Sequence, residues 1–259
     1  MKVGINVVSI FLWILIPHWG MEIATWIAKK AGFDGIQALP VRGVRAGMRL
    51  SLPILSAEGP WNATTFQRHL NGLPGEAGGP TKWQDVILFP DPWGCDQNLN
   101  QLAFNRQSVG FQRIRHSFDW NFPFKQVVEI HKGMGLTLEQ ILNLVSKGRL
   151  TLVLDTAHCR QPEVLRELGT TYQIIESLLP SISMVHLQGL NKGEWQNLLA
   201  HGTGFLSSVL RELKRKGYQG PIVLEFNPFW FGPGYLINPV PTLRRLREAV
   251  QREAGRLVA

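Results

Sequence analysis

Four side chains that can bind a divalent cation each close an apolar run in the second half of the chain. These residues are Glu129, Asp155, His186 and Glu225. The runs before them read VV, LVL, MV and VL, which is typical of short buried strands. The intervals of 26, 31 and 39 residues between the four positions each leave room for a helix, a strand and their loops. If the strands lie parallel in one sheet, their carboxyl ends share one edge, and the four polar groups converge there.

A divalent cation would resolve the conflict that this convergence creates. Three carboxylates and an imidazole in a partly buried site would repel one another and would be costly to remove from water. The oxygen-rich set favours a hard or borderline ion, and we expect one Mn²⁺, with Mg²⁺, Co²⁺ and Zn²⁺ also compatible. For any one residue alone, a hydrogen-bonded polar group at a strand end is the simpler interpretation. The four together predict a metal site.

The elements that would position this site form a repeating pattern of eight apolar runs. They are Val3–Val8, Gly35–Leu39, Leu50–Leu55, Asp85–Phe89, Gln126–Ile130, Leu150–Asp155, Ser183–Leu187 and Ile222–Phe226. Most are continuous rather than alternating, which indicates strands covered on both faces, as in a parallel sheet.

Amphipathic segments separate several of these runs and predict helices. The clearest are Met21–Lys30, Thr137–Gly148, Pro162–Leu179, Phe205–Lys216 and Pro241–Leu257. Thr137 and Gln140 stand at the spacing of a capping box. Eight strands alternating with helices over 259 residues predict a parallel, eight-stranded (β/α)8 TIM barrel. We find no linker or repeat, so residues 1–259 are expected to form a single domain.

Composition agrees with an ordinary globular protein and excludes disordered and low-complexity proteins. Hydrophobic residues make up 44% of the chain and charged residues 18%. The two cysteines lack CxxC spacing, so we expect a reducing, cytoplasmic setting. The apolar run Val7–Ile16 is too short to span a bilayer, and we interpret it as a buried strand and its continuation rather than a signal peptide. The net charge of +8 permits phosphate binding, but much of it falls on predicted outer helix faces.

Further residues follow the predicted strands and would surround the open end of the barrel at which the four strand-end residues converge. Trp61, Trp93 and Trp230 come just after the third, fourth and eighth runs, where they could stack on a sugar or cap the barrel core. His158 lies three residues beyond Asp155 and could ligate a second metal or contact substrate. Cys159 beside it is a weak candidate nucleophile, since the sequence supplies no partner acid or helix N-terminus for it.

Four segments of the second half carry a family resemblance. They read VVEIHKG, LVLDTAH, MVHLQG and HGTGFLSSVLRELKRKGYQGPIVLEFNP. In order and spacing they resemble the xylose isomerase-like TIM barrel superfamily, which contains sugar isomerases and epimerases such as D-tagatose 3-epimerase and, more distantly, endonuclease IV. The likeness is good from Gln126 to Pro228 and holds only in outline over the first 120 residues.

The resemblance implies roles for particular residues. Glu129, Asp155, His186 and Glu225 match the metal ligands of the epimerases, and His158 matches a substrate-contacting histidine. The implied activity is isomerisation or epimerisation of a small sugar through an enediolate at the carbon next to the ketose carbonyl. Glu129 and Glu225 would then accept and donate the proton. The expected partner is a sugar, with no nucleic acid and no membrane, and a homo-oligomer is left open.

Departures from the family pattern keep two alternatives in view. The helix after the Gly202-Thr203-Gly204 turn begins with Phe205 where the family usually has an acidic residue. The loops after the third and fourth runs lack the histidines that endonuclease IV uses, and only His201 could replace any of them. These departures disfavour a three-zinc phosphodiesterase like endonuclease IV. They also admit a degenerate barrel that binds a sugar without turning it over.

Overall fold

The computed structural model describes residues 1–10, 20–38, 50–59, 87–90, 125–126, 128–131, 137–147 and 151–255. Trp61 and Trp93 lie outside these residues. In the described part of the chain, nine strand segments form one sheet in the order β5-β4-β3-β2-β1-β9-β8-β7-β6. Their bounds are β1 Val3–Asn6, β2 Gly35–Ala38, β3 Ile54–Gly59, β4 Ile87–Pro90, β5 Lys125–Gln126, β6 Val128–Glu129, β7 Leu152–Asp155, β8 Ile182–Gln188 and β9 Ile222–Glu225. Every pair is parallel.

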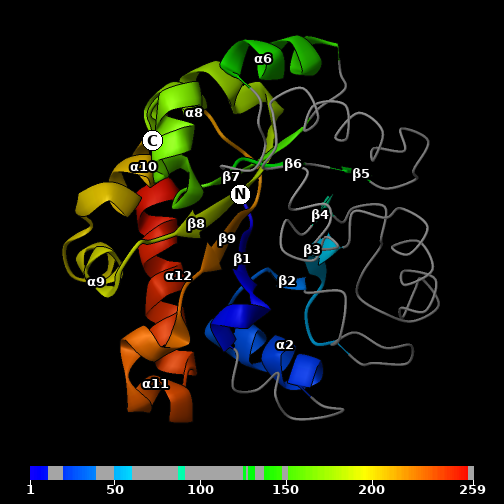
Figure 1. The fold of residues 1–259 in the computed structure, drawn as a ribbon. Coiled ribbons are helices and arrows are strands. Elements are labelled where there is room, and N and C mark those ends of the chain that lie inside the picture. The colour runs from blue at the N-terminus through cyan, green and yellow to red at the C-terminus, as the bar shows by residue number, and fades with distance from the viewer. Residues whose placement is uncertain are drawn as a thin grey trace.

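The two strands at the ends of this order, β5 and β6, are adjacent in the chain. β5 pairs with β4 and β6 pairs with β7, while only Val127, outside the described residues, separates β5 from β6. The predicted fifth strand, Gln126–Ile130, therefore has Gln126 in β5 at one end of the sheet and Val128 and Glu129 in β6 at the other end. β4 and β6 also lie in contact. The result is a curled parallel sheet of the barrel type (Figure 1).

Helices cover the outside of the described sheet. They are α2 Gly20–Ala31, α6 Leu138–Ser146, α7 Pro162–Leu168, α8 Thr171–Leu178, α9 Lys192–His201, α10 Gly204–Arg215, α11 Pro233–Ile237 and α12 Val240–Gly255. Short 3-10 turns are η1 Val7–Ile10, η3 His158–Arg160, η4 Leu179–Ser181 and η5 Pro228–Phe231. α12 packs between α10 and α2. None of the described helices is long and apolar enough to cross a membrane.

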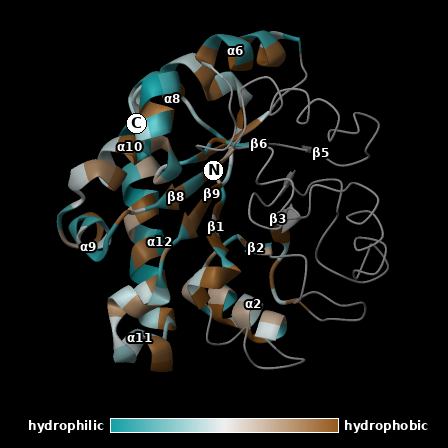
Figure 2. Cartoon of the chain, viewed as in Figure 1, coloured by the Kyte–Doolittle hydropathy of each residue, from teal (hydrophilic) through white to brown (hydrophobic). Residues whose placement is uncertain are grey.

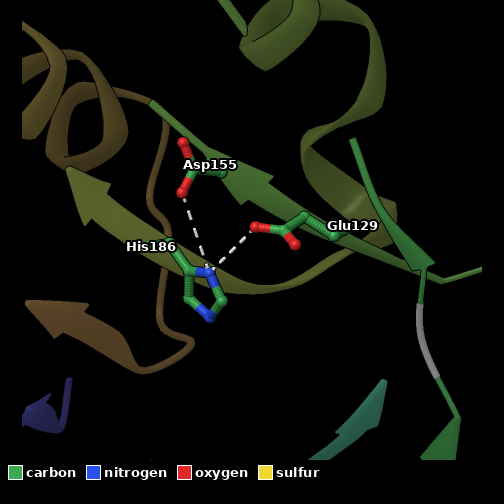
Figure 3. Close-up of side chains that lie close together, drawn as sticks. All are labelled: Glu129, Asp155 and His186. Carbon is green, nitrogen blue, oxygen red and sulfur yellow. Dashed lines mark hydrogen bonds and ion pairs between the residues drawn. The ribbon is translucent and has the colours of Figure 1, made fainter. Parts of the chain in front are cut away.

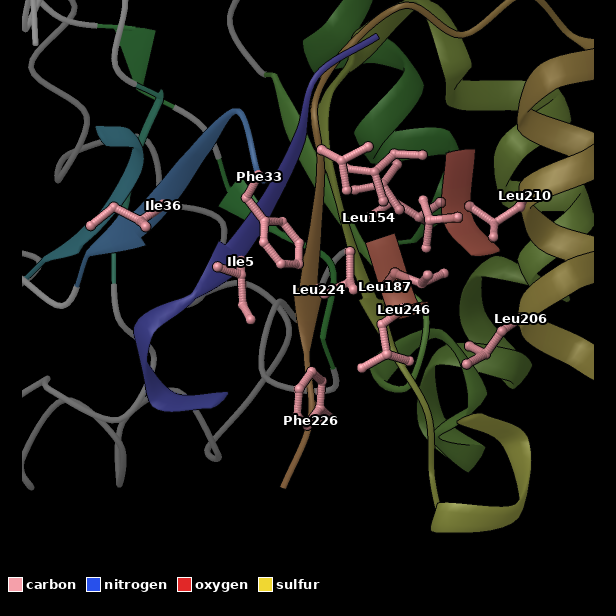
Figure 4. Close-up of a cluster of buried hydrophobic side chains, with 14 of the residues drawn as sticks. Ile5, Phe33, Ile36, Leu154, Leu187, Leu206, Leu210, Leu224, Phe226 and Leu246 are labelled. Atoms are coloured by element: carbon pink, nitrogen blue, oxygen red, sulfur yellow. The ribbon is translucent and has the colours of Figure 1, made fainter. Parts of the chain in front are cut away.

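Alternation along the strands divides the buried side chains into two sets. Leu154, Leu187 and Leu224 belong to the large core that also contains Leu210 and Leu246 of α10 and α12 (Figure 4). The strand residues on the other face, Val153, Met184 and Val223, form a separate cluster. Figure 2 shows the corresponding pattern, with hydrophobic strands inside and hydrophilic surfaces on the outer helices. The second cluster is the apolar floor of the sheet's concave side.

The first strand is shorter than its apolar run suggested. β1 ends at Asn6, and Val7–Ile10 continues as a 3-10 turn rather than as strand. The side-chain Oδ1 of Asn6 accepts a hydrogen bond from the Val8 N–H at 2.9 Å. This local bond gives the backbone an alternative to further strand pairing, and the chain turns there.

The third strand is displaced along the sequence from its predicted position. The prediction began at Leu50, but β3 starts at Ile54 and runs to Gly59. Pro53 precedes it, and proline lacks the N–H that a strand position inside a sheet would donate. The strand therefore takes in Ser56, which the sequence analysis had placed in the following loop.

The single helix predicted over Pro162–Leu179 is wrong, because the structure breaks it into α7 and α8. Gly169 between them has a φ of 86°, a left-handed value that ends a helix readily. Thr170 then starts α8 by accepting from the Gln173 N–H, and the Gln173 side chain accepts from the Thr170 N–H. A second capping box was thus present in the sequence and was overlooked. The one at Thr137 and Gln140 is confirmed.

Candidate metal centre

The strand period places the predicted ligands on the concave face of the sheet. Val153, Met184 and Val223 form the inner apolar cluster. Residues two positions later on the same strands, Asp155, His186 and Glu225, point to the same side. They therefore form a polar layer directly above the apolar floor, at the carboxyl ends of β7, β8 and β9.

The imidazole of His186 is the centre of this layer. Its Nδ1 lies 3.1 Å from Glu129 Oε1, 3.9 Å from Asp155 Oδ2 and 3.8 Å from Glu225 Oε2. Glu129, Asp155 and His186 are buried, and each has a ligand atom within 4.8 Å of the others (Figure 3). The structure thus brings together all four residues that the sequence placed at strand ends.

Asp155 is held by the backbone at the start of its loop. Its Oδ1 accepts from the N–H groups of Ala157 and His158, both at 2.7 Å. If the Gln188 amide is turned so that its nitrogen faces this carboxylate, Gln188 also donates to Asp155 Oδ2 at 3.0 Å. Burial, and then the charge of Glu129, raise the pKa of Asp155 to about 7 in spite of these bonds.

Glu225 is oriented by a residue on the neighbouring strand. The Asn6 Nδ2 donates to Glu225 Oε2 at 3.0 Å. Because Asn6 Oδ1 is occupied by the Val8 N–H, the amide must present its nitrogen to the carboxylate. Burial is the largest cause that raises the pKa of Glu225 to about 7; Asp155 and Glu129 add to it, while His186 and Asn6 oppose it.

These environments fit a bound cation. Burial lowers the pKa of His186 and favours the neutral imidazole that metals require, even though Glu225 and Asp155 oppose the shift. The pKa values of Asp155 and Glu225 are raised mainly by burial, which disfavours the negative charge of each carboxylate, and neighbouring carboxylates add to the effect. A divalent ion supplies positive charge and returns the carboxylates to the ionised form.

His158 stands at the edge of the centre. Its Nδ1 lies 3.8 Å from Glu129 Oε1, and its ring meets that of His131 edge-on, with centroids 6.2 Å apart. The buried Nδ1 makes no hydrogen bond within the described residues. His158 is thus close enough to the centre to contact a ligand there. The sequence analysis did not single out His131.

Two other candidate site residues from the sequence analysis, Cys159 and His201, do not belong to the candidate metal centre. Cys159 is fully buried in the outer core, and burial, followed by the charges of Asp155 and Glu129, raises the pKa of its thiol well above the ordinary range. A thiol held protonated in this way is a poor nucleophile. His201 is exposed at the end of α9, and the metal-binding group found among the described residues does not include it.

Aromatic residues follow β9 in the short turn η5. Trp230 is half-buried and packs against the core, an arrangement compatible with both the stacking and the capping alternatives. Its neighbour Phe229 is 58% exposed and was not singled out. Of the three predicted tryptophans, only Trp230 lies in the described part of the chain.

Asn6 and Gln188 are site residues that the sequence analysis missed. Each closes or nearly closes a strand, as the four predicted ligands do, so the same pattern could have identified them. They were passed over because carboxamides are weaker signals of metal chemistry than carboxylates and imidazoles.

Comparison with solved structures identifies the architecture. A xylose isomerase domain-containing protein from Salmonella typhimurium LT2 matches with a TM-score of 0.53 and 13% identity, over 100% of this chain and 97% of that one. The chain has the xylose isomerase-like fold. The IolI protein, solved with a zinc atom, matches at 0.56 and 14% over 98% of both chains. D-allulose 3-epimerase from Methylomonas sp., solved with D-allulose, matches at 0.52 and 14%, over 98% and 97%.

At sequence identities this low, the likeness shows that the chain shares the xylose isomerase-like fold and does not show a shared activity. No family model matches the sequence, and the comparison with curated proteins finds no match. The chemistry therefore has to be argued from the residues of the centre.

Proposed function

We propose that this protein is a divalent-metal-dependent sugar isomerase or epimerase. The supporting observation is the buried group formed by Glu129, Asp155 and His186, with Glu225 3.8 Å from the same imidazole nitrogen. These four residues would hold one ion, with Mn²⁺ as the expected metal and Mg²⁺, Co²⁺ or Zn²⁺ as alternatives. When bound, the ion would stabilise negative charge on the carbonyl oxygen of a ketose and on the adjacent hydroxyl.

In this proposal, two carboxylates move the substrate proton. Glu129 approaches His186 from β6, and Glu225 approaches it from β9, the strand on the other side of β8 from β7. One would remove the proton from the carbon next to the carbonyl to give an enediolate, and the other would return a proton to it. Asn6 keeps one oxygen of Glu225 engaged, which limits the rotation of that carboxylate.

The remaining proposals concern substrate contacts and setting. We assign His158 to a substrate hydroxyl, because its buried Nδ1 faces the centre without a hydrogen bond in the described part of the chain. Trp61, Trp93 and Trp230 remain proposed contacts with the C–H face of a sugar. We also propose a single closed eight-stranded barrel over residues 1–259, joined through Val127, and a cytoplasmic location based on cysteine usage.

Hydrogen exchange tests the function directly. Metal-loaded protein is incubated in D₂O with a panel of ketopentoses, ketohexoses and their phosphates. We expect deuterium at the carbon next to the carbonyl of at least one sugar. Glu225→Gln should lower this exchange at least about 100-fold, because it removes one of the two proton-transfer groups.

Glu248→Gln, an exposed change on α12, is the matched control and should leave exchange intact. Circular dichroism must show that both variants keep the wild-type fold. Absence of exchange across the whole panel in metal-loaded wild-type protein would favour a barrel that binds sugars without turnover.

A further inference from the structure

The polar layer of the centre continues past Glu225 onto three more strands. Asn6, Gln37 and Ser56 are each at most 1% exposed. Asn6 stands beside Gln37 in the register of β1 with β2, and Gln37 stands beside Ser56 in the register of β2 with β3. The layer thus has an acidic half on β6, β7, β8 and β9 and an uncharged half on β1, β2 and β3.

The direction of Gln37 follows from its neighbours on β2. Ile36 belongs to the outer core, so Gly35 and Gln37 face the concave side. A Cβ at Gly35 would come within 2.5 Å of Leu55 Cγ, so Leu55 occupies the inner space that this glycine leaves. Gln37 therefore stands one layer above Leu55, at the level of Asn6.

The carboxamides of Asn6 and Gln37 differ in how many of their hydrogen-bonding atoms have partners. Asn6 uses both ends of its amide, on Glu225 and on the Val8 N–H. Gln37 Oε1 accepts from the Ser56 hydroxyl at 3.4 Å, but its buried Nε2 makes no hydrogen bond within the described residues. A buried amide donor without an acceptor costs free energy, and folded proteins rarely tolerate one without a reason.

We propose that Gln37 and Ser56 form the binding site for the uncharged, hydroxyl-bearing end of the sugar. Gln37 Nε2 would donate to a substrate hydroxyl, while the carbonyl end of the same molecule lies between Glu129 and Glu225. This orientation rests on the proposed function. Amide and hydroxyl groups suit neutral oxygens and supply none of the positive charge that a phosphate requires. The substrate class is therefore an unphosphorylated ketose.

A variant that keeps the shape of Gln37 separates binding from structure. Gln37→Met removes the unpaired amide, so the melting temperature of the free protein should rise. Affinity for D-glucitol, a sugar alcohol that has no carbonyl and cannot react, should fall about tenfold by calorimetry. Ser56→Ala is a smaller second change, and it should weaken glucitol binding a few-fold.

Ser207→Ala is the matched control. Ser207 is also fully buried, and its Oγ makes no hydrogen bond in the part of the chain that the structure describes, but it lies on α10, away from the layer. It should leave the affinity for glucitol unchanged.

Several outcomes would overturn the assignment. They are equal glucitol affinity in wild type, Gln37→Met and Ser56→Ala, no glucitol binding by wild type, and tighter binding of glucitol 6-phosphate than of glucitol. A lower melting temperature with unchanged affinity would show a purely structural role for Gln37.

Deuterium exchange is scored separately from glucitol binding. Glucitol binding that depends on Gln37 without any ketose exchange would contradict the proposed activity and leave this site standing. Ketose exchange that Gln37→Met does not affect would contradict this site and leave the proposed activity standing.

Discussion

Asp155 accepts hydrogen bonds from two backbone N–H groups that fix its position, and its removal should empty the proposed metal site. Asp155→Ala is expected to weaken Mn²⁺ binding at least about 100-fold, since even outer partners of metal ligands are worth 10- to 100-fold. Metal content by elemental analysis after chelation and reloading measures the effect. Glu163→Ala, an exposed change on α7, serves as control. Full metal occupancy in Asp155→Ala would remove this residue from the site.

Asn6 has two roles that variants can separate. Asn6→Ala removes both the acceptor for the Val8 N–H and the donor to Glu225. Asn6→Asp keeps the acceptor and removes the donor. We expect both variants to lower kcat for deuterium exchange by about tenfold with little change in KM, because Glu225 is no longer oriented.

Metal content should stay near the wild-type level in both Asn6 variants. If Asn6→Asp exchanges at the wild-type rate, Asn6 acts only in ending the first strand. Metal content and the rate of deuterium exchange together distinguish a residue that positions Glu225 from a purely structural one.

At the scale of single residues, the sequence predicted the charged members of the site better than the neutral ones. Glu129, Asp155, His186 and Glu225 could be found because an ionisable group at the end of an apolar run is costly unless something neutralises it. Asn6 and Gln37 are buried at corresponding levels on β1 and β2, but neutral amides are common in many settings. Their importance depends on strand register, which one sequence does not reveal.

Among the helices, the break between α7 and α8 offers a test with an internal control. Thr170 accepts a hydrogen bond at the start of α8, whereas Thr203, at the start of α10, makes no side-chain capping bond. Both threonines are exposed. Thr170→Ala should lower the free energy of unfolding by about 1 kcal/mol, and Thr203→Ala should change it by less than about half of that. Urea denaturation of both variants measures the difference, and equal effects would contradict the capping assignment.

Prediction of the elements succeeded where local signals were strong. The capping box at Thr137 and Gln140 marked the start of α6 correctly, and continuous apolar runs located most of the strands. The first and third strands were misplaced because Asn6 and Pro53 act on the backbone, while the prediction followed hydrophobicity alone. α9 and α11 were missed. α9 is weakly amphipathic, with Trp195 and Leu198 as its fully buried residues, and α11 has only five residues.

For the whole molecule, the buried carboxyl groups predict how stability depends on pH. Asp155 and Glu225 have pKa values of about 7 in the folded protein, against ordinary values of 3.8 and 4.5. The folded state therefore binds more protons than the unfolded state between these limits, and metal-free protein should lose stability as pH rises from about 4 to about 7. Titration of His186 opposes this loss of stability below pH 6.5, because burial lowers the pKa of the imidazole. The effect of one imidazole is smaller than the combined effect of two carboxyl groups.

Melting temperatures of chelated protein measured across this pH range test the expectation. Asp155→Asn should flatten the dependence, and added Mn²⁺ should stabilise the wild type most at the alkaline end. A melting temperature of the metal-free wild type that falls with pH no more steeply than that of Asp155→Asn would contradict the raised pKa.

The hydrogen bond between Asn6 and Glu225 joins residues 219 positions apart in the chain. β1 cannot pair with β9 until the chain has left the ribosome as far as Glu225, and contacts so distant in sequence form slowly because a long loop must close first. Every earlier folding intermediate therefore lacks one of the four groups of the centre. During synthesis, such a chain would expose Glu129, Asp155 and His186 before Glu225 arrives, so the proposed centre is assembled only after β9 has joined the sheet.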